Sequence, residues 1–421
     1  MTSQELNKYY KWELLALLCC AYFLHQADRA IFGVMLSAIQ KDLQLTDSEV
    51  GLIGTTLFVA LAVMTPIAGY VGDVFNRKWI VICSLVFWST ATLSTGLTSG
   101  LVGLLLLRST ATAWGESFYA PAALPLLASF HKSTRTIAMS IHQATLYIAV
   151  MISGVLAGFI ADHWGWRSAF FLYGGGGILL GSIFVFRLRS APPESSEVRE
   201  GKKGRITPRE ALRVILRTPT ALLITVSFTA VVLQANAYIV WAPCFIQEKF
   251  NLSMTQAGGL AMFSLYLPSL VGVLVGGMLS DRMVVTRPQF RLEMQSTFMF
   301  LCAPAILLMA LAHSLPLTCC GMIALGLFQG TYQSNTPASF FDVIEPRYRS
   351  SVYGVQITLA FLIGSVAPWM LGHFREVFGD GKGLSYGFAV LSSTYVIGGL
   401  AMVAALVFTF RRDRYIEVPL T

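Results

Sequence analysis

The chain has 421 residues, of which 55% are hydrophobic and only 12% are charged, and its formal net charge is +8. A soluble globular protein has about 25% charged residues, so a compact soluble body of this size lacks the ionised groups to cover its surface. The same numbers exclude a disordered chain, a collagen, a coiled coil and a disulfide scaffold. They leave a polytopic membrane protein.

Twelve apolar stretches follow one another along the chain, each long enough to cross a bilayer as a helix. They lie at about 13–39, 49–71, 79–98, 101–128, 135–161, 168–188, 220–246, 255–279, 292–312, 315–340, 350–373 and 385–410. A bilayer offers no water to unpaired backbone groups, so we expect α-helices. The strands of a transmembrane β-barrel would instead show alternating apolar and polar residues over about ten positions. The first stretch is too long for the apolar region of a signal peptide, and we expect it to remain uncleaved.

Basic residues are distributed unevenly between the two sides of this arrangement. With the N-terminus inside, the cytoplasmic segments hold 23 of the 30 Lys and Arg residues and the outer loops hold five. This bias predicts that both termini are cytoplasmic. The positive charge therefore reflects topology and gives no reason to expect a nucleic-acid partner. We expect a multi-pass protein of the plasma membrane, which in a bacterium is the inner membrane.

A polar linker and an internal repeat divide the chain into two halves. We expect an N-terminal half of six helices at 1–189, a cytoplasmic linker at 190–218 and a C-terminal half of six helices at 219–421. Residues 207–217 could form a surface amphipathic helix, and a plain solvated linker is the alternative. The run from Gly69 through Asp73 to Arg77-Lys78 follows the second helix, and Asp281-Arg282 follows the eighth. Two homologous halves with a substrate path between them are a recurrent transporter design.

With this repeat, the chain resembles a major facilitator superfamily transporter over essentially its full length. The Gly69 to Lys78 run is similar to the superfamily's loop motif between helices two and three, although Val74 and Asn76 stand where Arg and Gly are usual. The resemblance implies a latch that holds the two halves together in the outward-open state. Its residues would be Gly69, Asp73, Arg77, Lys78, Asp281 and Arg282. The alternative is a generic positively charged loop.

Two further segments resemble the anion:cation symporter family and the Spinster-like group of this superfamily. His25-Gln26-Ala27-Asp28-Arg29 resembles their first-helix signature, and Gly115 to Pro121, with Arg108 upstream, resembles their fourth helix. Family members place the arginine seven residues before the glutamate, whereas Arg108 and Glu116 are eight apart. On a regular helix, eight positions leave the two side chains about 80° apart. Either the helix is wound differently here, or Arg108 is not the substrate arginine.

Four ionisable residues lie within the apolar stretches, where each is costly to bury: Asp28, Arg29, Arg108 and Glu116. An anion that binds an arginine would free a paired carboxylate to take up a proton. We therefore predict proton coupling at Asp28 and Glu116, and substrate binding at Arg29 and Arg108. His25 shares a helix side with Asp28 and Arg29 and is a third candidate for proton coupling. The alternative is that Asp28–Arg29 and Arg108–Glu116 are structural ion pairs.

Neutral polar residues complete the predicted substrate cavity, although each of them is also compatible with packing. They are His142, Gln143, Tyr147, Gln234, Tyr238, Gln329, Tyr332, Gln333, Asn335 and Gln356. The segment from Tyr238 to Pro243 resembles a Trp-x-Pro segment that helps to close the outer gate of such carriers. Trp241 could equally be a membrane-belt aromatic residue.

No cofactor or metal is expected. The seven cysteines show no metal-ligand spacing, and the Gly174–Gly177 run lacks the Gly-Lys-Ser/Thr of a P-loop. The GxxxG spacings at Gly154 and Gly326 most simply allow close helix contacts, and we expect a monomer in the lipid bilayer. These features give no indication of an enzyme.

The favoured function is a secondary active transporter that carries a small organic anion, such as a sugar acid or another carboxylate, together with protons. The alternative is a Spinster-like carrier or exporter of lysolipids or other amphiphiles, which predicts an apolar cavity. A membrane-embedded enzyme or sensor is a third and weaker hypothesis, because no nucleophile or metal constellation is present.

Overall fold

The computed structural model describes residues 3–131, 134–190, 207–379 and 382–415, and within these ranges it is helical and contains no strand. The first half consists of α1 (Ser3–Leu43), α2 (Asp47–Val74), α3 (Arg77–Thr95), α4 (Leu101–Gly103), the π-helix η1 (Leu104–Ala111), α5 (Thr112–Phe130), α6 (Arg135–Trp164) and α7 (Trp166–Arg187). A short helix, α9 (Pro208–Arg217), precedes the second half. That half consists of α10 (Pro219–Phe250), α11 (Met254–Val284), α12 (Phe290–Leu311), α13 (Leu315–Gln333), α14 (Thr336–Phe341), α15 (Arg349–Gly364), α16 (Val366–Phe378), α17 (Gly383–Ala404), the π-helix η2 (Ala405–Thr409) and α18 (Phe410–Asp413).

These helices supply twelve membrane spans. In the described residues, eleven helical segments are long and apolar enough to cross a membrane. The remaining span is the continuous helical run of α4, η1 and α5, which is less apolar because it carries Arg108 and Glu116. The prediction of an all-α protein with twelve transmembrane helices is therefore confirmed.

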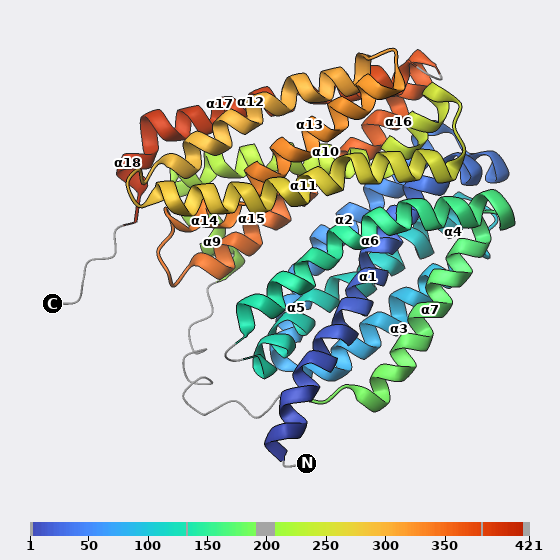
Figure 1. Cartoon of the computed structure of the whole chain (residues 1–421), viewed down its shortest axis with the longest axis horizontal. Coiled ribbons are helices and arrows are strands. Elements are labelled where there is room, and N and C mark those ends of the chain that lie inside the picture. Colours follow the sequence, from blue (N-terminus) through green and yellow to red (C-terminus); the bar gives the residue numbers. More distant parts are fainter. Residues whose placement is uncertain (1–2, 132–133, 191–206, 380–381, 416–421) are drawn as a thin grey trace.

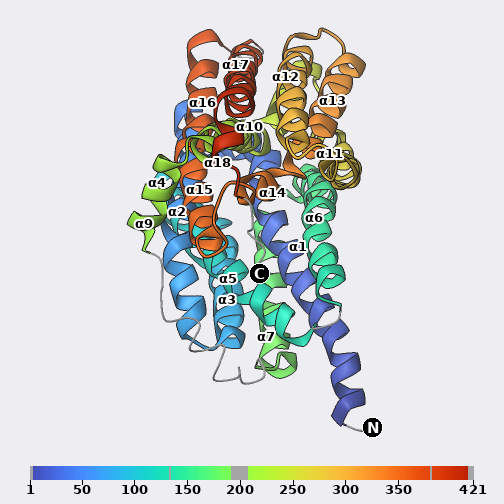
Figure 2. The same ribbon diagram turned by 90° about the vertical axis from the view of Figure 1, so that its left-hand side faces the viewer.

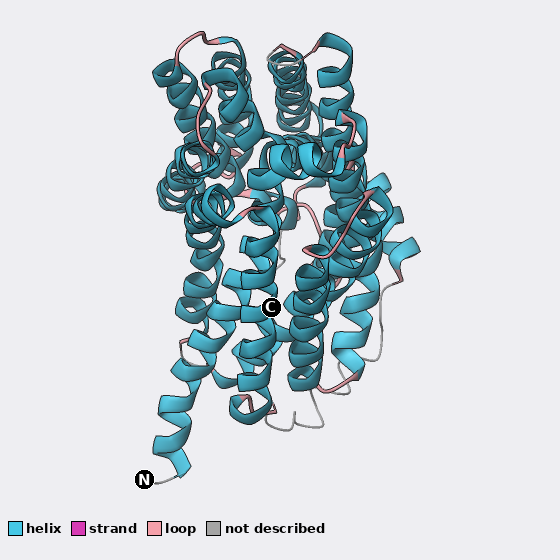
Figure 3. Cartoon of the chain, turned by 90° about the vertical axis from the view of Figure 1, so that its right-hand side faces the viewer, coloured by secondary structure: helices cyan, strands magenta, loops and turns pink. Residues whose placement is uncertain are grey.

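The spans form two bundles, α1–α7 and α10–α18, which meet at one end and separate toward the end that carries both chain termini (Figure 1). The view in Figure 2 shows the second bundle above the first. The opposite view, coloured by secondary structure, shows helices joined by loops and no strand in the described residues (Figure 3). The end where the bundles meet is formed by the last turns of α1, α6, α10 and α16 and the first turns of α2 and α11.

Glycines bring the two bundles into close contact at this closed end. A Cβ atom on Gly33 would collide with the carbonyl oxygen of Ile239, and one on Gly154 would collide with Gly258 across the interface. Gly158 meets the backbone of Met254 in the same way. The GxxxG spacing of Gly154 and Gly158 thus serves close helix contact, as expected.

An ion cluster centred on Arg375 of α16 adds polar contacts to the closed end. The Arg375 guanidinium donates to Asp47 and to Gln40 Oε1 (2.8 Å) in the first half, and to Glu248 Oε1 (2.6 Å) in its own half. Trp241 lies beneath this cluster, fully buried, and its Nε1 donates to the carbonyl oxygen of Pro368 at 2.8 Å. A membrane-belt tryptophan would be exposed, so the belt interpretation of Trp241 is wrong.

Candidate functional site

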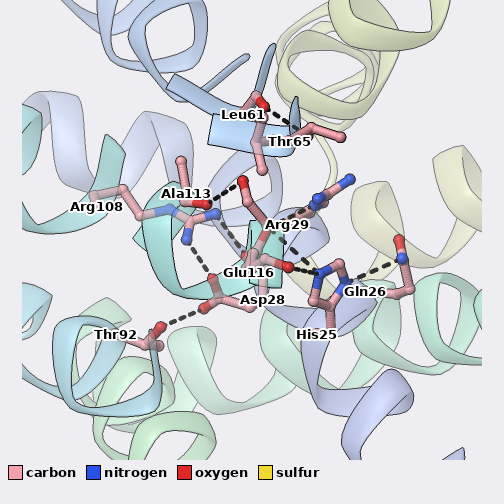
Figure 4. A network of polar contacts seen from close by, with 11 residues as sticks. His25, Gln26, Asp28, Arg29, Leu61, Thr65, Thr92, Arg108, Ala113 and Glu116 are labelled. Atoms are coloured by element: carbon pink, nitrogen blue, oxygen red, sulfur yellow. Dashed lines mark hydrogen bonds and ion pairs between the residues drawn. The ribbon is translucent and has the colours of Figure 1, made fainter. Parts of the chain in front are cut away.

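Two ion pairs connect α1 to the fourth span of the first bundle (Figure 4). Arg29 Nε donates to Glu116 Oε2 at 2.7 Å. Arg108 donates from Nη1 to Asp28 Oδ2 at 2.6 Å and from Nη2 to the Asp28 carbonyl oxygen at 2.7 Å. Each pair therefore crosses between helices, and the alternative pairing of Asp28 with Arg29 and of Arg108 with Glu116 is wrong. Neighbouring residues on a helix point about 100° apart, so Asp28 and Arg29 reach different partners.

The π-helix η1 explains how Arg108 and Glu116 both face α1 despite their spacing of eight. A π turn holds one extra residue, so eight positions across η1 give about the same rotation about the helix axis as seven positions on a regular α-helix. Two threonine hydroxyls stabilise these wide turns by donating to carbonyl oxygens five residues back: Thr110 to Leu105 and Thr112 to Leu107, both at 2.9 Å. The helix is therefore wound differently here, which is the first of the two alternatives, and substrate binding by Arg108 stays a prediction.

The two pairs differ in their access to solvent. The Arg108 and Asp28 side chains are only 1% and 3% exposed. Thr92 donates to the free carboxylate oxygen of Asp28 at 2.9 Å, and the Arg108 guanidinium lies 5.6 Å from the centre of the Phe32 ring. Arg29, by contrast, is 19% exposed, although its partner Glu116 is fully buried. The Arg29–Glu116 pair is therefore the one that a ligand can reach.

Arg29 and Glu116 lie at one end of a cavity between the two bundles. The cavity has a volume of about 370 Å³, within the range of about 300–1,000 Å³ that is typical of small-molecule sites. His25, Arg29, Glu116 and Ser117 form its polar end. The remaining wall is largely apolar and consists of Leu61, Ala62, Thr65, Ala120, Pro121, Leu124, Pro125, Ile357, Thr358 and Phe361. The site is thus a charged patch at the end of an apolar slot.

His25 is fixed beside Glu116 by hydrogen bonds on both ring nitrogens. Gln26 Nε2 donates to His25 Nδ1 at 3.1 Å, which leaves His25 Nε2 to donate to the Glu116 carbonyl oxygen at 3.3 Å. His25 Nε2 also lies 3.9 Å from Glu116 Oε2. The second carboxylate oxygen, Oε1, is buried and has no hydrogen-bond partner among the described residues. These contacts place an imidazole and an unpartnered carboxylate oxygen at the polar end of the cavity.

The predicted polar residues of α6 lie behind or beside this site and do not line the described cavity. His142 is buried, stacks on Tyr22 with ring centres 4.3 Å apart, and donates from Nε2 to the Tyr119 hydroxyl at 3.2 Å. Gln143 lies exposed on the helix surface. Tyr147 contacts Tyr266 of the other bundle, with ring centres 6.4 Å apart. The role of His142, Gln143 and Tyr147 in substrate binding stays a prediction.

The predicted polar residues of the second half are mostly buried within their own bundle. Tyr238 donates to the Ala261 carbonyl oxygen at 2.7 Å, and Tyr332 donates to Ser227 Oγ at 3.0 Å. The others are Gln234, Gln329, Asn335 and Gln356, which are buried, and Gln333, which is half-buried. The cavity instead receives Ile357, Thr358 and Phe361 from this half. Sequence reasoning missed Thr65, Ser117 and Thr358, because single hydroxyl residues in an apolar run carry no distinguishing signal.

The predicted latch residues lie at the open end, near the chain termini. Lys78 Nζ donates to the Val185 carbonyl oxygen at 3.3 Å within the first half, and Asp281 and Arg282 of the second half are exposed. Gly69 lies in α2 and Arg77 begins α3. The side chain of Asp73 lies outside the described residues.

Two helical bundles around a central cavity that is closed at one end and open at the other are the architecture of an alternating-access membrane transporter. The chain matches the Major Facilitator Superfamily over residues 18–368. It belongs to this superfamily and is a multi-pass membrane transporter.

Similar proteins place the chain near the Spinster-like group. It is 26% identical to Protein spinster homolog 1 of Bos taurus, over 94% of this chain and 80% of that protein. It is 24% identical to an MFS-type efflux pump of Mycolicibacterium smegmatis, over 96% and 93% of the two chains. Its fold matches a bacterial homologue of the human lysosomal transporter Spinster, in an inward-facing and unoccupied conformation, with a TM-score of 0.85. That match has 20% identity and covers 97% and 99% of the two chains.

Proposed function

We propose that this transporter carries an amphipathic organic anion together with a proton by alternating access. The observation that carries the proposal is the partly exposed Arg29–Glu116 ion pair at the polar end of an otherwise apolar cavity. A guanidinium binds carboxylate, phosphate and sulfonate oxygens through paired hydrogen bonds. The apolar wall accommodates the hydrocarbon part of the same molecule.

Coupling follows from competition for one arginine. An anion that takes the place of Glu116 on the Arg29 guanidinium accepts the Nε–H that now donates to the carboxylate. Once the anion displaces the carboxylate, Glu116 remains in a buried site without its positive partner, and a proton stabilises it there. His25, 3.9 Å from the carboxylate, is placed to relay this proton. The anion and the proton then occupy the site together, which is the requirement for symport.

The cavity wall favours an amphiphile over a sugar acid. A sugar acid presents hydroxyl groups over its whole length, and each buried hydroxyl needs a hydrogen-bond partner. Beyond the polar end, the side-chain hydroxyls that line the cavity in the described part of the chain are those of Thr65 and Thr358. The buried amides and tyrosines of the second half do not reach it. The names of the similar spinster homologues and of the efflux pump are compatible with this choice, whereas the D-xylose-proton symporter shares the fold alone, at 13% identity.

The basic-residue bias supports cytoplasmic termini, and with that orientation the cavity opens inward. In this state the exposed Asp281 and Arg282 are free to meet the first-half loop when the bundles close at the cytoplasmic end. We therefore assign the latch role of Gly69, Asp73, Arg77, Lys78, Asp281 and Arg282 to the outward-facing state.

Proteoliposomes with an imposed pH gradient test the function. The probes are octanesulfonate and gluconate, two monoanions that stay ionised near neutral pH and differ in having an apolar or a hydroxylated chain. We expect gradient-driven uptake of octanesulfonate by the wild type, loss of this uptake in Arg29→Gln, and no change in the control Arg287→Gln, which removes an exposed charge. Uptake of gluconate in place of octanesulfonate would indicate a sugar-acid carrier. Absence of gradient-driven uptake of either anion would refute the proposal.

A further inference from the structure

The short helix α9 lies at the outer edge of the second bundle, just before the span α10 (Figure 2). Thr207 caps its N-terminus by accepting a hydrogen bond from the Glu210 backbone N–H at 3.2 Å, and Pro208 occupies the first helical turn. Ala211 and Ile215 are fully buried and pack into the apolar cluster that also contains Ile224 of α10 and Val352 of α15. The helix is therefore fixed on the bundle and is not a loose part of a linker.

Two further stripes run along α9, and both are exposed. Leu212 and Leu216 form the first stripe and are 36% and 60% exposed. The second stripe is formed by Arg209, Arg213 and Arg217, which are all exposed. None of the three arginines makes an ion pair or a side-chain hydrogen bond within the part of the chain that the structure describes.

The order of these stripes around the helix is informative. At about 100° per residue, and with Arg209 at zero, the arginines lie at about 0°, 40° and 80°. The leucines lie at about 300° and 340°, and the buried pair lies at about 200° and 240°. The leucine stripe therefore separates the face that contacts the protein from the arginine stripe. A helix that lies in a membrane surface has this pattern, with apolar residues toward the acyl chains and cations at the level of the headgroups.

We propose that α9 is a docking site for anionic phospholipid headgroups of the cytoplasmic leaflet. The helix enters the span α10 directly at Pro219, so it lies at the membrane surface. Three guanidiniums one turn apart, without a partner among the described residues, complement a row of phosphates. The adjacent leucines need an apolar environment that water does not provide. The surface therefore fits a single occupant, the anionic bilayer itself. This inference does not depend on the transported substrate.

Competition between phosphatidylglycerol and phosphatidylcholine for the purified full-length protein tests the proposal. The protein is equilibrated with mixed micelles of the two lipids, and the ratio of co-purified lipids is measured by mass spectrometry. We expect a preference for phosphatidylglycerol that decreases at least about tenfold in the triple variant Arg209→Gln/Arg213→Gln/Arg217→Gln, since each arginine near an anionic surface contributes about a factor of five. The triple Arg→Lys variant should keep most of the preference.

A matched control removes three exposed arginines from the same side of the protein: Arg287→Gln/Arg411→Gln/Arg414→Gln. This control should lower the preference by less than threefold. An equal decrease in the control would mean that net charge alone attracts the lipid, and it would overturn the proposal. An unchanged preference in the α9 triple glutamine variant would overturn it as well.

Discussion

Removal of Arg108 and removal of Arg29 should have different consequences, because the two ion pairs differ in their access to solvent. Arg108→Ala leaves Asp28 sealed in the bundle without its cation, at a side-chain exposure of 3%. Loss of one partner from a buried ion pair costs about 3–5 kcal/mol. Arg29→Ala leaves Glu116 next to a cavity from which it can take up a proton, so we expect a cost of only about 1–3 kcal/mol.

Size-exclusion chromatography of the heated, detergent-solubilised protein separates these outcomes. Arg108→Ala should lose its monodisperse peak at a much lower temperature than the wild type. Arg29→Ala should keep most of its thermal stability but should no longer bind octanesulfonate. The double variant Asp28→Asn/Arg108→Gln removes both charges at nearly constant volume and should recover most of the stability that Arg108→Ala loses.

The relative effects can also contradict this interpretation. Equal destabilisation by Arg29→Ala and Arg108→Ala would show that the two pairs do not differ in structural importance. Full stability of Arg108→Ala would show that the deep pair does not hold α1 against the fourth span.

Three further predictions concern the π-helix and the closed end. Deletion of Thr110 removes the extra residue of η1 and should yield folded protein. Deletion of Ala122, which lies in the α-helix α5, rotates the rest of that helix by about 100° and should prevent folding. Expression followed by size-exclusion chromatography compares the two variants. Gly33→Val places side-chain atoms where the Ile239 carbonyl oxygen lies, so overpacking should reduce octanesulfonate uptake by about tenfold. The control Gly175→Val meets open space and should not reduce uptake. Arg375→Gln removes the cation at the centre of the ion cluster, so it should increase maleimide labelling of the buried Cys244 by several-fold, as measured by mass spectrometry. Unchanged labelling would show that the cluster does not hold the closed end together.

The four buried charges could be predicted from the sequence because an ionisable residue is conspicuous in an apolar run. Their pairing could not, because it depends on the winding of the fourth span and on where α1 crosses it. The spacing of eight between Arg108 and Glu116 raised a different winding as one alternative, but no residue pattern at 104–111 decides between a π-helix and an α-helix. Whether the side chains of Gln234 and Tyr332 face the cavity or the packed interior of their bundle depends on how their helices are rotated about their own axes. A helix with apolar residues on all sides carries no periodicity that would reveal this rotation.

The twelve spans, by contrast, followed from hydropathy alone, because a bilayer requires long apolar helices. The apolar character of the cavity wall is a property of helices that meet only in the folded protein, namely α2, α5 and α15. It could not be derived from any one of them, and for this reason a small organic anion and an amphiphile were both compatible with the sequence.

Proton uptake on ligand binding tests the coupling between Arg29 and Glu116 most directly. Octanesulfonate is added to purified protein in a weakly buffered solution near neutral pH, and a pH indicator reports the protons taken up. The headgroup itself does not titrate there, so the predicted result is an uptake that approaches about one proton per bound anion in the wild type. Glu116→Gln should bind the anion without proton uptake. Equal proton uptake by Glu116→Gln, or binding by the wild type with no proton uptake, would contradict the proposed mechanism.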